Sequence, residues 1–285
     1  MKELSGVIAA IPTPLDREEN VDVRGLCNVI DHVIDQGVAG IFVLGSMGEG
    51  PALLDSQKRL VVETAAKQIH GRVTLLAAIS EVSTRRTLEM GKQLQELGPD
   101  YLVATSPFYF SFPHMDSIKL FMNCLAENLA TPLVFYNVPS RTGNKITLEA
   151  LECIMHMPQV AGIKDSSCDL PFVVELLRRY PQGSSRPCRI LQGDESVYDV
   201  SLLMGADGLV AGGGSCFVPL LVKLYAAAKC GDRALAFQLQ REFRSQMDEM
   251  LGPELPIDWV HAVKKRFAEK GLCGDQVTSP FLQRK

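Results

Sequence analysis

Short apolar runs alternate with helical periods along most of the chain, and this alternation constrains the fold more than any other feature. Each run has the length and character of a strand that is buried on both faces. The eight expected strands span residues 6–13, 40–44, 74–78, 101–104, 132–136, 160–164, 189–192 and 207–210. A helical period follows each strand, so the pattern predicts an α/β protein with a closed (β/α)8 barrel, the TIM-barrel topology. An open, doubly wound sheet is the alternative, but no G-x-G-x-x-G motif follows the first strand.

The chain also divides into two parts. The expected helices span residues 23–36, 55–69, 83–97, 116–130, 147–155, 170–180, 197–204 and 219–229. Asp55 is expected to be the N-cap of the second helix. From Cys230 onward there are helical periods but no convincing strand, with a break around Gly252, Pro253 and Pro256. We therefore expect a catalytic barrel over residues 1–229 and a C-terminal helical extension over residues 230–285.

Charge and composition exclude several classes of function. The chain has 285 residues and a formal net charge of -4, which leaves no basic surface of the kind that binds nucleic acid. No apolar run is as long as a membrane span, so no membrane partner is expected. The first residues lack the pattern of a signal peptide, and a cytoplasmic location is the expectation.

Cysteine and histidine spacing gives no sign of a disulfide framework or a metal site. The eight cysteines form no C-x-x-C pair and are scattered, so we expect reduced and mostly buried thiols. The five histidines occur singly, without H-x-x-x-H spacing. We expect neither a metal nor another cofactor.

Lys164 is the first candidate for chemistry. It ends the apolar run 160–164 and would lie at the carboxyl end of a strand, the rim where α/β barrels place their active sites. Burial of an ammonium group is costly and lowers its pKa. A neutral amine can then attack a ketone and form a Schiff base. A lysine that simply reaches into solvent is the alternative, and it is the commoner case for a single lysine.

Other loops that follow strands would share this rim. The glycine-rich turn 45–50 precedes a helix, and its N–H groups can hold a carboxylate or a phosphate, although a tight turn without ligand is an equal interpretation. Tyr136 and Arg141 follow the fifth strand and can serve proton transfer and carboxylate pairing. The glycines 212–214 have no neighbouring lysine or arginine, which favours a plain turn over a phosphate site. The aromatic residues 108–110 are more often packing than catalysis. Together these groups fit a Schiff-base enzyme that acts on keto acids.

At these motifs the sequence resembles the dihydrodipicolinate synthase and N-acetylneuraminate lyase family, a family of pyruvate-dependent class I aldolases. The resemblance covers essentially the whole chain. The matching segments are Gly45-Ser46-Met47-Gly48-Glu49, the run from Tyr136 to Gly143, Gly162-Ile163-Lys164-Asp165, and, in the right order, Thr13-Pro14, Gly193-Asp194 and Gly205-Ala206-Asp207-Gly208.

The resemblance implies a role for each matched residue. Lys164 would form the imine with pyruvate, and Tyr136 would carry protons to and from the bound substrate. The backbone of Ser46 and Met47 would hold the pyruvate carboxylate. The Ser46 hydroxyl would link Tyr136 to Tyr109, which in this family comes from a neighbouring subunit of a homotetramer, a dimer of dimers. The remaining substrate-binding residues implied by the resemblance are Arg141, Gly193 and Val210.

Two departures leave the second substrate open. Synthases of this family usually carry threonine where this chain has Met47, and the segment 48–53 resembles the 2-keto-3-deoxy-sugar-acid aldolases. Arg141 stands where synthases grip the carboxylate of aspartate semialdehyde, and a guanidinium suits such a bidentate contact. A dihydrodipicolinate synthase-like enzyme that condenses pyruvate with a carboxylated aldehyde is the leading hypothesis. The alternatives are a sugar-acid or N-acetylneuraminate-type aldolase or dehydratase, and a non-catalytic sensor of keto acids.

Overall fold

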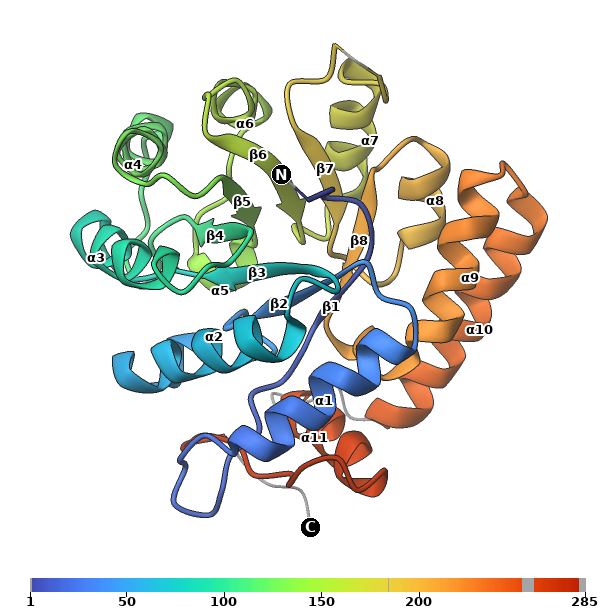
Figure 1. Cartoon of the computed structure of the whole chain (residues 1–285). Coiled ribbons are helices and arrows are strands. Elements are labelled where there is room, and N and C mark those ends of the chain that lie inside the picture. The colour runs from blue at the N-terminus through green and yellow to red at the C-terminus, as the bar shows by residue number, and fades with distance from the viewer. Residues whose placement is uncertain (1, 184, 253–258, 282–285) are drawn as a thin grey trace.

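The computed structural model describes residues 2–183, 185–252 and 259–281, and it contains a closed barrel of eight parallel strands (Figure 1). Each strand pairs with the next along the chain, and β8 returns to β1, with Ile8 opposite Val210. The predicted (β/α)8 barrel is therefore confirmed. The strands are β1 Gly6–Ala10, β2 Gly40–Val43, β3 Thr74–Ala78, β4 Tyr101–Thr105, β5 Leu133–Asn137, β6 Val160–Asp165, β7 Arg189–Gln192 and β8 Gly208–Ala211.

Helices surround the barrel and cover its outer wall (Figure 1). They are α1 Val23–Asp35, α2 Asp55–Ile69, α3 Thr84–Gln95, α4 Met115–Asn128, α6 Leu148–Met155, α7 Leu170–Arg179, α8 Tyr198–Leu203 and α9 Val218–Lys229. The N-cap predicted at Asp55 is wrong, because Asp55 is the first helical residue and Leu54 is the cap. The Gln57 side chain accepts the Leu54 N–H at 3.0 Å and so stabilises the helix start in place of a capping aspartate.

Three short elements that the sequence did not predict all follow strands. They are η1 Gly50–Ala52 after β2, α5 Pro139–Thr142 after β5, and η2 Gly213–Phe217 after β8. Because parallel strands end at the same side of a barrel, these three turns lie at the carboxyl-end rim, where the candidate site residues are expected.

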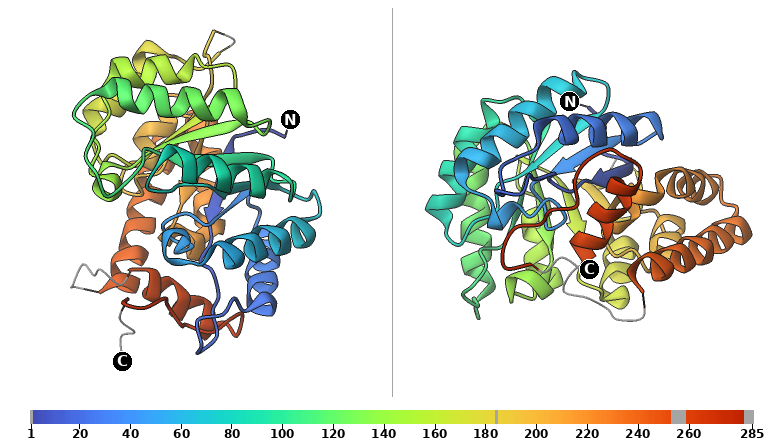
Figure 2. Two further views of the ribbon diagram at one scale, coloured as in Figure 1. Left: turned by 90° about the vertical axis from the view of Figure 1, so that its left-hand side faces the viewer. Right: turned by 90° about the horizontal axis from the view of Figure 1, so that it is seen from below.

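Two further helices follow the barrel. Helix α10 Arg233–Leu251 lies along α9 on the outside (Figure 1), and α11 Trp259–Glu269 lies at the end of the molecule away from the N-terminus (Figure 2, left). Helix α10 ends at Gly252, whose φ is 74°. Pro253 and Pro256, the rest of the expected break, lie outside the described residues. The boundary at residues 229 and 230 stays a prediction.

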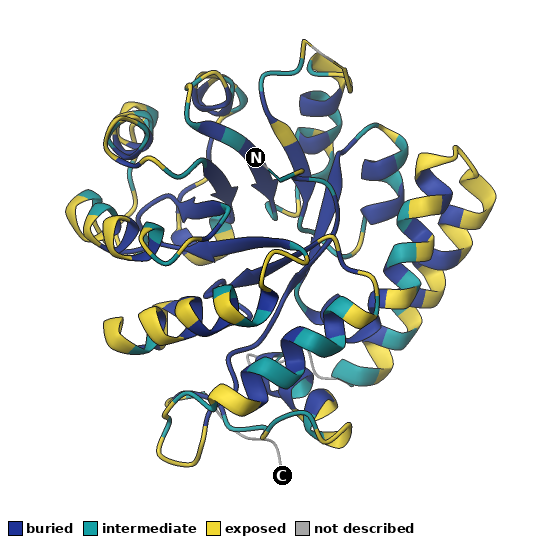
Figure 3. Cartoon of the chain, viewed as in Figure 1, coloured by how far each residue is buried: buried dark blue, intermediate teal, exposed yellow. Residues whose placement is uncertain are grey.

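The core consists of the barrel interior and the layer between the barrel and its helices. Every residue of β1 to β5 is buried, as the unbroken apolar runs require for strands covered on both faces. Figure 3 shows the buried barrel and the exposed outer faces of the helices. No helix among the described residues is long and apolar enough to cross a membrane.

The eight cysteines are free thiols, but the expectation that most are buried is wrong. Only Cys188 and Cys216 are buried, and burial raises the pKa of each to about 12. Cys153, Cys168 and Cys230 are exposed, because they lie on the outer face of a helix, in a rim loop and at a helix end.

Candidate active site

Lys164 and Tyr136 lie side by side on the inner wall of the barrel. They are paired in register across β5 and β6, and each is 7% exposed. The Lys164 Nζ atom lies 3.8 Å from the centroid of the Tyr136 ring and 5.1 Å from the centroid of the Phe42 ring. No carboxylate lies within ion-pair distance of this nitrogen among the residues that the structure describes. Two aromatic rings therefore border the amine directly.

The next residue of β6 points the other way and stabilises the strand end. Successive side chains of a strand alternate between faces, so Asp165 lies outside the barrel. Its carboxylate accepts hydrogen bonds from Asn137 Nδ2 at 2.6 Å and from the Ser167 hydroxyl at 2.7 Å. Burial raises the pKa of the Asp165 carboxyl, and these donors oppose the rise. This network joins β5 to β6 directly behind Tyr136 and Lys164, and it fixes where their side chains enter the barrel.

The glycine-rich turn 45–50 is tightly folded. Leu44, directly before the turn, and Glu49 within it have left-handed φ angles of 62° and 54°. A Cβ on Gly50 would lie 1.9 Å from the Leu44 carbonyl oxygen. The N–H groups of Ser46 and Met47 donate no hydrogen bond to any other described residue. The turn therefore presents two backbone donors of the kind that bind an anion.

Gly193 is a position of close approach. It follows β7, and its N–H donates to the Asp165 carbonyl oxygen at 2.6 Å. A Cβ there would lie 2.7 Å from Lys164 Cε and 2.2 Å from Ser166 Oγ, so a side chain would displace the lysine. Val210, in contrast, is buried within β8, and its carbonyl oxygen accepts the Tyr198 hydroxyl at 3.1 Å.

A cavity of about 300 Å³ opens beside these residues. Ser46, Tyr136 and Arg141 form part of its wall, whereas Lys164, Met47, Gly193 and Val210 do not. Arg141 is exposed at the end of α5 and has no ion pair with another described residue. A guanidinium in this position is available to an anionic group of a ligand in the cavity.

The C-terminal segment completes the cavity wall, which the sequence did not reveal. Trp259 and Val260 of α11 and Phe281 are among the residues that line the cavity. A Cβ on Gly212 would lie 3.1 Å from the Trp259 ring, so the ring lies over this glycine. The single tryptophan of the chain was the available signal, because such a residue in a helical tail requires an apolar surface to cover it.

Glu195 is a second residue that the sequence did not reveal. Its Oε1 atom accepts the Gly214 N–H at 2.8 Å, so the chain's own carboxylate occupies the glycine turn 212–214. Burial raises the pKa of the Glu195 carboxyl, while the N–H groups of Gly214 and Gly212 and the Lys164 ammonium oppose the rise. This contact agrees with the prediction that residues 212–214 form a plain turn and not a phosphate site. The sequence feature that could have revealed Glu195 is its position three residues beyond the end of a strand, in a loop at the rim.

Tyr109 lies away from the other site residues of its own chain. Its side chain is 84% exposed, and its ring packs edge-on against that of Phe110, which is 62% exposed. No hydrogen bond joins Ser46 to Tyr136 or to Tyr109 among the described residues. A single chain contains no second subunit, so the expected bridge through Ser46 stays a prediction.

The described residues contain no group of three or more His, Cys, Asp or Glu side chains that could hold a metal ion. The carboxyl-end rim instead contains the Lys164 amine, the Tyr136 phenol, the Arg141 guanidinium and the backbone N–H groups of Ser46 and Met47. An amine of this kind forms an imine with a carbonyl compound, and the donors can hold a carboxylate beside it. A (β/α)8 barrel with a buried amine at its carboxyl-end rim is the arrangement typical of lyases of the class I aldolase type.

Comparison with known proteins places the chain within this class. The model of the dihydrodipicolinate synthetase family matches residues 3–284. A DapA-like lyase of Halobacterium salinarum is 31% identical over 98% of this chain and 88% of its own length. The N-acetylneuraminate lyase of an Enterobacter species is 31% identical over 88% of this chain and 82% of that protein.

A solved structure agrees in fold. The dihydrodipicolinate synthase of Acinetobacter baumannii, complexed with pyruvate, superposes with a TM-score of 0.91 at 25% identity, over 99% of this chain and 94% of the other. The chain belongs to the dihydrodipicolinate synthetase family of pyruvate-dependent lyases. Relatives of the synthase type and of the N-acetylneuraminate lyase type match it equally well.

Proposed function

We propose that this protein condenses pyruvate with an aldehyde through an imine on Lys164. The observation that carries the proposal is the Lys164 amine, which lies at the barrel rim against the Tyr136 ring with no carboxylate partner among the described residues. Its nitrogen attacks C2 of pyruvate, the C2 oxygen leaves as water, and an imine forms. The imine withdraws electrons, so C3 loses a proton and becomes the nucleophilic carbon of an enamine. C3 then bonds to the aldehyde carbon, which restores the imine, and the aldehyde oxygen takes up a proton. Water hydrolyses this imine, which releases the product as a keto acid and returns the free Lys164 amine.

The remaining rim groups have matching roles in this proposal. Tyr136 transfers protons in this proposal, because its phenol belongs to the ring whose centroid lies 3.8 Å from Lys164 Nζ. The N–H groups of Ser46 and Met47 bind the pyruvate carboxylate, and Gly193 leaves room for the imine carbon beside Lys164 Cε. Val210 stays a predicted substrate contact from β8, where its carbonyl oxygen also accepts the Tyr198 hydroxyl at 3.1 Å.

We propose that a second copy of the chain completes the site. Tyr109 and Phe110 are large side chains in an exposed loop, and such aromatic residues are typical of protein interfaces. Docked on a neighbour, Tyr109 would reach that neighbour's Ser46 and extend the proton path to Tyr136. A homotetramer built as a dimer of dimers, in the cytoplasm, stays the corresponding prediction.

Arg141 favours a carboxylated aldehyde, such as aspartate semialdehyde, as the second substrate. Its guanidinium borders the cavity and has no competing ion pair among the described residues. A sugar-derived aldehyde is the second candidate. It is favoured by Met47, which lacks the hydroxyl of a threonine.

A substrate panel decides between these candidates. Purified protein and pyruvate are incubated with aspartate semialdehyde or with a sugar aldehyde such as N-acetylmannosamine, and pyruvate consumption is measured. Turnover with aspartate semialdehyde alone supports the synthase-like function, and turnover with the sugar alone supports the aldolase. Pyruvate binding without turnover of either aldehyde would indicate the sensor.

A further inference from the structure

A fully buried ion pair connects the C-terminal extension to the glycine-rich turn. Glu49 belongs to the turn, Lys264 belongs to α11, and both side chains are 0% exposed. Glu49 Oε1 pairs with Lys264 Nζ, while Glu49 Oε2 accepts the Thr278 N–H at 2.7 Å and the Thr278 hydroxyl at 2.8 Å. Lys264 Nζ also donates to the Gln276 carbonyl oxygen at 2.5 Å. The glutamate is thus bound on both carboxylate oxygens by the last described part of the chain.

Because Glu49 belongs to the turn, the Glu49–Lys264 pair can affect the backbone conformation of the turn. Glu49 lies two residues beyond Met47 and has a left-handed backbone, which is unfavourable for a residue with a side chain. Its N–H donates to the Ser46 carbonyl oxygen at 3.3 Å. A side chain that is held at both oxygens therefore keeps the backbone of Ser46 and Met47 in one conformation.

The charge of Glu49 is a second reason to expect that the pair affects anion binding at the turn. An uncompensated carboxylate at Glu49 would lie close to the anion that the Ser46 and Met47 donors attract, and like charges repel strongly at low local dielectric. Lys264 compensates this charge through its ion pair with Glu49 Oε1. Burial lowers the pKa of the Lys264 ammonium, and the neighbouring Glu49 carboxylate opposes that shift.

We propose that Lys264 is a positioning residue, which acts through Glu49 to hold the turn in its carboxylate-binding conformation. The C-terminal extension would then be required for binding pyruvate and not only for covering the cavity. The catalytic part of this inference rests on the proposed function, whereas the ordering of the turn does not.

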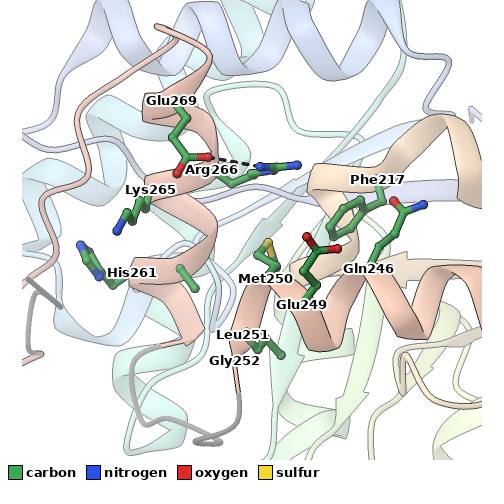
Figure 4. Close-up of a pocket in the computed structure, with 11 residues that line it drawn as sticks. Phe217, Gln246, Glu249, Met250, Leu251, Gly252, His261, Lys265, Arg266 and Glu269 are labelled. Carbon is green, nitrogen blue, oxygen red and sulfur yellow. Dashed lines mark hydrogen bonds and ion pairs between the residues drawn. The ribbon is translucent and has the colours of Figure 1, made fainter.

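The neighbouring residue provides a matched control. Lys265 has the same charge on the same helix, but it is exposed and faces a cavity of about 650 Å³ between α10 and α11 (Figure 4). Lys264→Met and Lys265→Met therefore make the same chemical change, one at the turn and the other on the far side of α11. Lys264→Arg retains the charge and should retain part of the function.

The first measurement is the amount of pyruvate adduct trapped by borohydride as the pyruvate concentration increases. We expect Lys264→Met to raise the half-saturating concentration about ten- to a hundredfold, the value of a charge-assisted hydrogen bond, and Lys265→Met to leave it unchanged. A mere loss of folded protein would lower the amount of adduct at saturation without changing the half-saturating concentration. A value for Lys264→Met within twofold of wild type contradicts the proposal.

The double variant Glu49→Gln/Lys264→Met covers the case in which the single variant does not fold. A neutral pair of similar volume often replaces a buried ion pair without loss of stability. We expect its half-saturating concentration to rise about two- to tenfold, as for the loss of one neutral hydrogen bond. An unchanged value would again contradict the proposal.

Hydrogen exchange without pyruvate tests the ordering of the turn independently. We expect the amides of Glu49 and Gly50, which bond to the Ser46 and Gly45 carbonyl oxygens, to exchange at least about tenfold faster in Lys264→Met than in Lys265→Met. Equal exchange overturns the inference. If wild type forms no adduct, the proposed function fails, and hydrogen exchange still decides whether Lys264 orders the turn.

Discussion

Two buried charged residues at opposite ends of the barrel, Asp207 and Lys164, differ in how their charges are compensated. At the amino ends of the strands, Asp207 is 1% exposed, and its carboxylate pairs with Arg186 at 2.7 Å and Arg189 at 3.0 Å. It also accepts the Ile190 N–H at 2.8 Å. At the carboxyl ends, Lys164 is almost as buried but has no carboxylate partner among the described residues. The Asp207 charge is compensated within the protein, whereas the Lys164 amine has no such partner.

The largest effect is expected for Tyr136 at the carboxyl-end rim. Tyr136→Phe keeps the ring that lies 3.8 Å from Lys164 Nζ and removes only the hydroxyl. Loss of a positioned acid–base group typically lowers the rate about 10²–10⁴-fold, so kcat should fall by this order while the thermal midpoint stays within a few degrees. A kcat within threefold of wild type would remove Tyr136 from the proton path.

The amino-end rim should respond in the opposite way. Asp207→Asn leaves the buried Arg186 guanidinium without its charge partner, and breaking a buried pair costs about 3–5 kcal/mol of unfolding free energy. Denaturant unfolding measures the loss, and kcat per folded molecule should not change. Asp100→Asn is the control, because its pair with Lys2 is partly exposed and should contribute less than about 1 kcal/mol. Equal losses in the two variants would show that burial of the Asp207 pair is unimportant.

The variant Arg141→Ala tests whether the exposed part of the carboxyl-end rim recognises the second substrate. If its guanidinium binds a carboxylate of the aldehyde, Arg141→Ala should raise the KM of the aldehyde about ten- to a hundredfold and that of pyruvate far less. Steady-state kinetics with each substrate varied in turn measures the two values. Equal changes in both KM values would assign Arg141 a structural role.

Glu195 should show the smallest effect, and it concerns stability. Burial raises the pKa of this carboxyl in the folded state. Below the ordinary pKa of a glutamate both states are protonated, and above it the unfolded state ionises first, so this group reduces stability as the pH rises. Glu195→Gln should therefore gain about 0.5–2 kcal/mol relative to wild type at pH 7 and nothing at pH 4. Unfolding at the two pH values measures the difference, and a constant difference would contradict this account.

The sequence predicts the barrel well because each strand is buried on both faces and is therefore a continuous apolar run. The strand ends are less predictable for a physical reason. Asn137 and Asp165 are polar residues of the kind common in loops. Each nevertheless extends its strand, because Asn137 Nδ2 donates a hydrogen bond to the Asp165 carboxylate at 2.6 Å. Lys164 and Tyr136 were predictable because a residue at the end of a parallel strand must lie on the rim.

Contacts between distant segments were not predictable. Glu49 and Thr278 are 229 residues apart, and nothing in either local pattern shows that their side chains meet. Trp259 and Phe281 line the cavity for the same reason, through the path of the C-terminal segment over the rim. Periodicity predicts elements and the faces that they bury, but the surface against which a tail packs depends on the completed barrel.

Borohydride trapping with peptide mapping tests the central claim most directly. Lys229 is the internal comparison, because it lies at the amino-end rim, donates to the Ala206 carbonyl oxygen at 3.0 Å, and has a pKa that burial lowers. A lowered pKa alone would favour an adduct on Lys229, whereas the geometry of the carboxyl-end rim favours Lys164. After incubation with pyruvate and borohydride, we predict one reduced pyruvyl group, on Lys164. An unmodified Lys164, with or without an adduct on Lys229, would contradict the account.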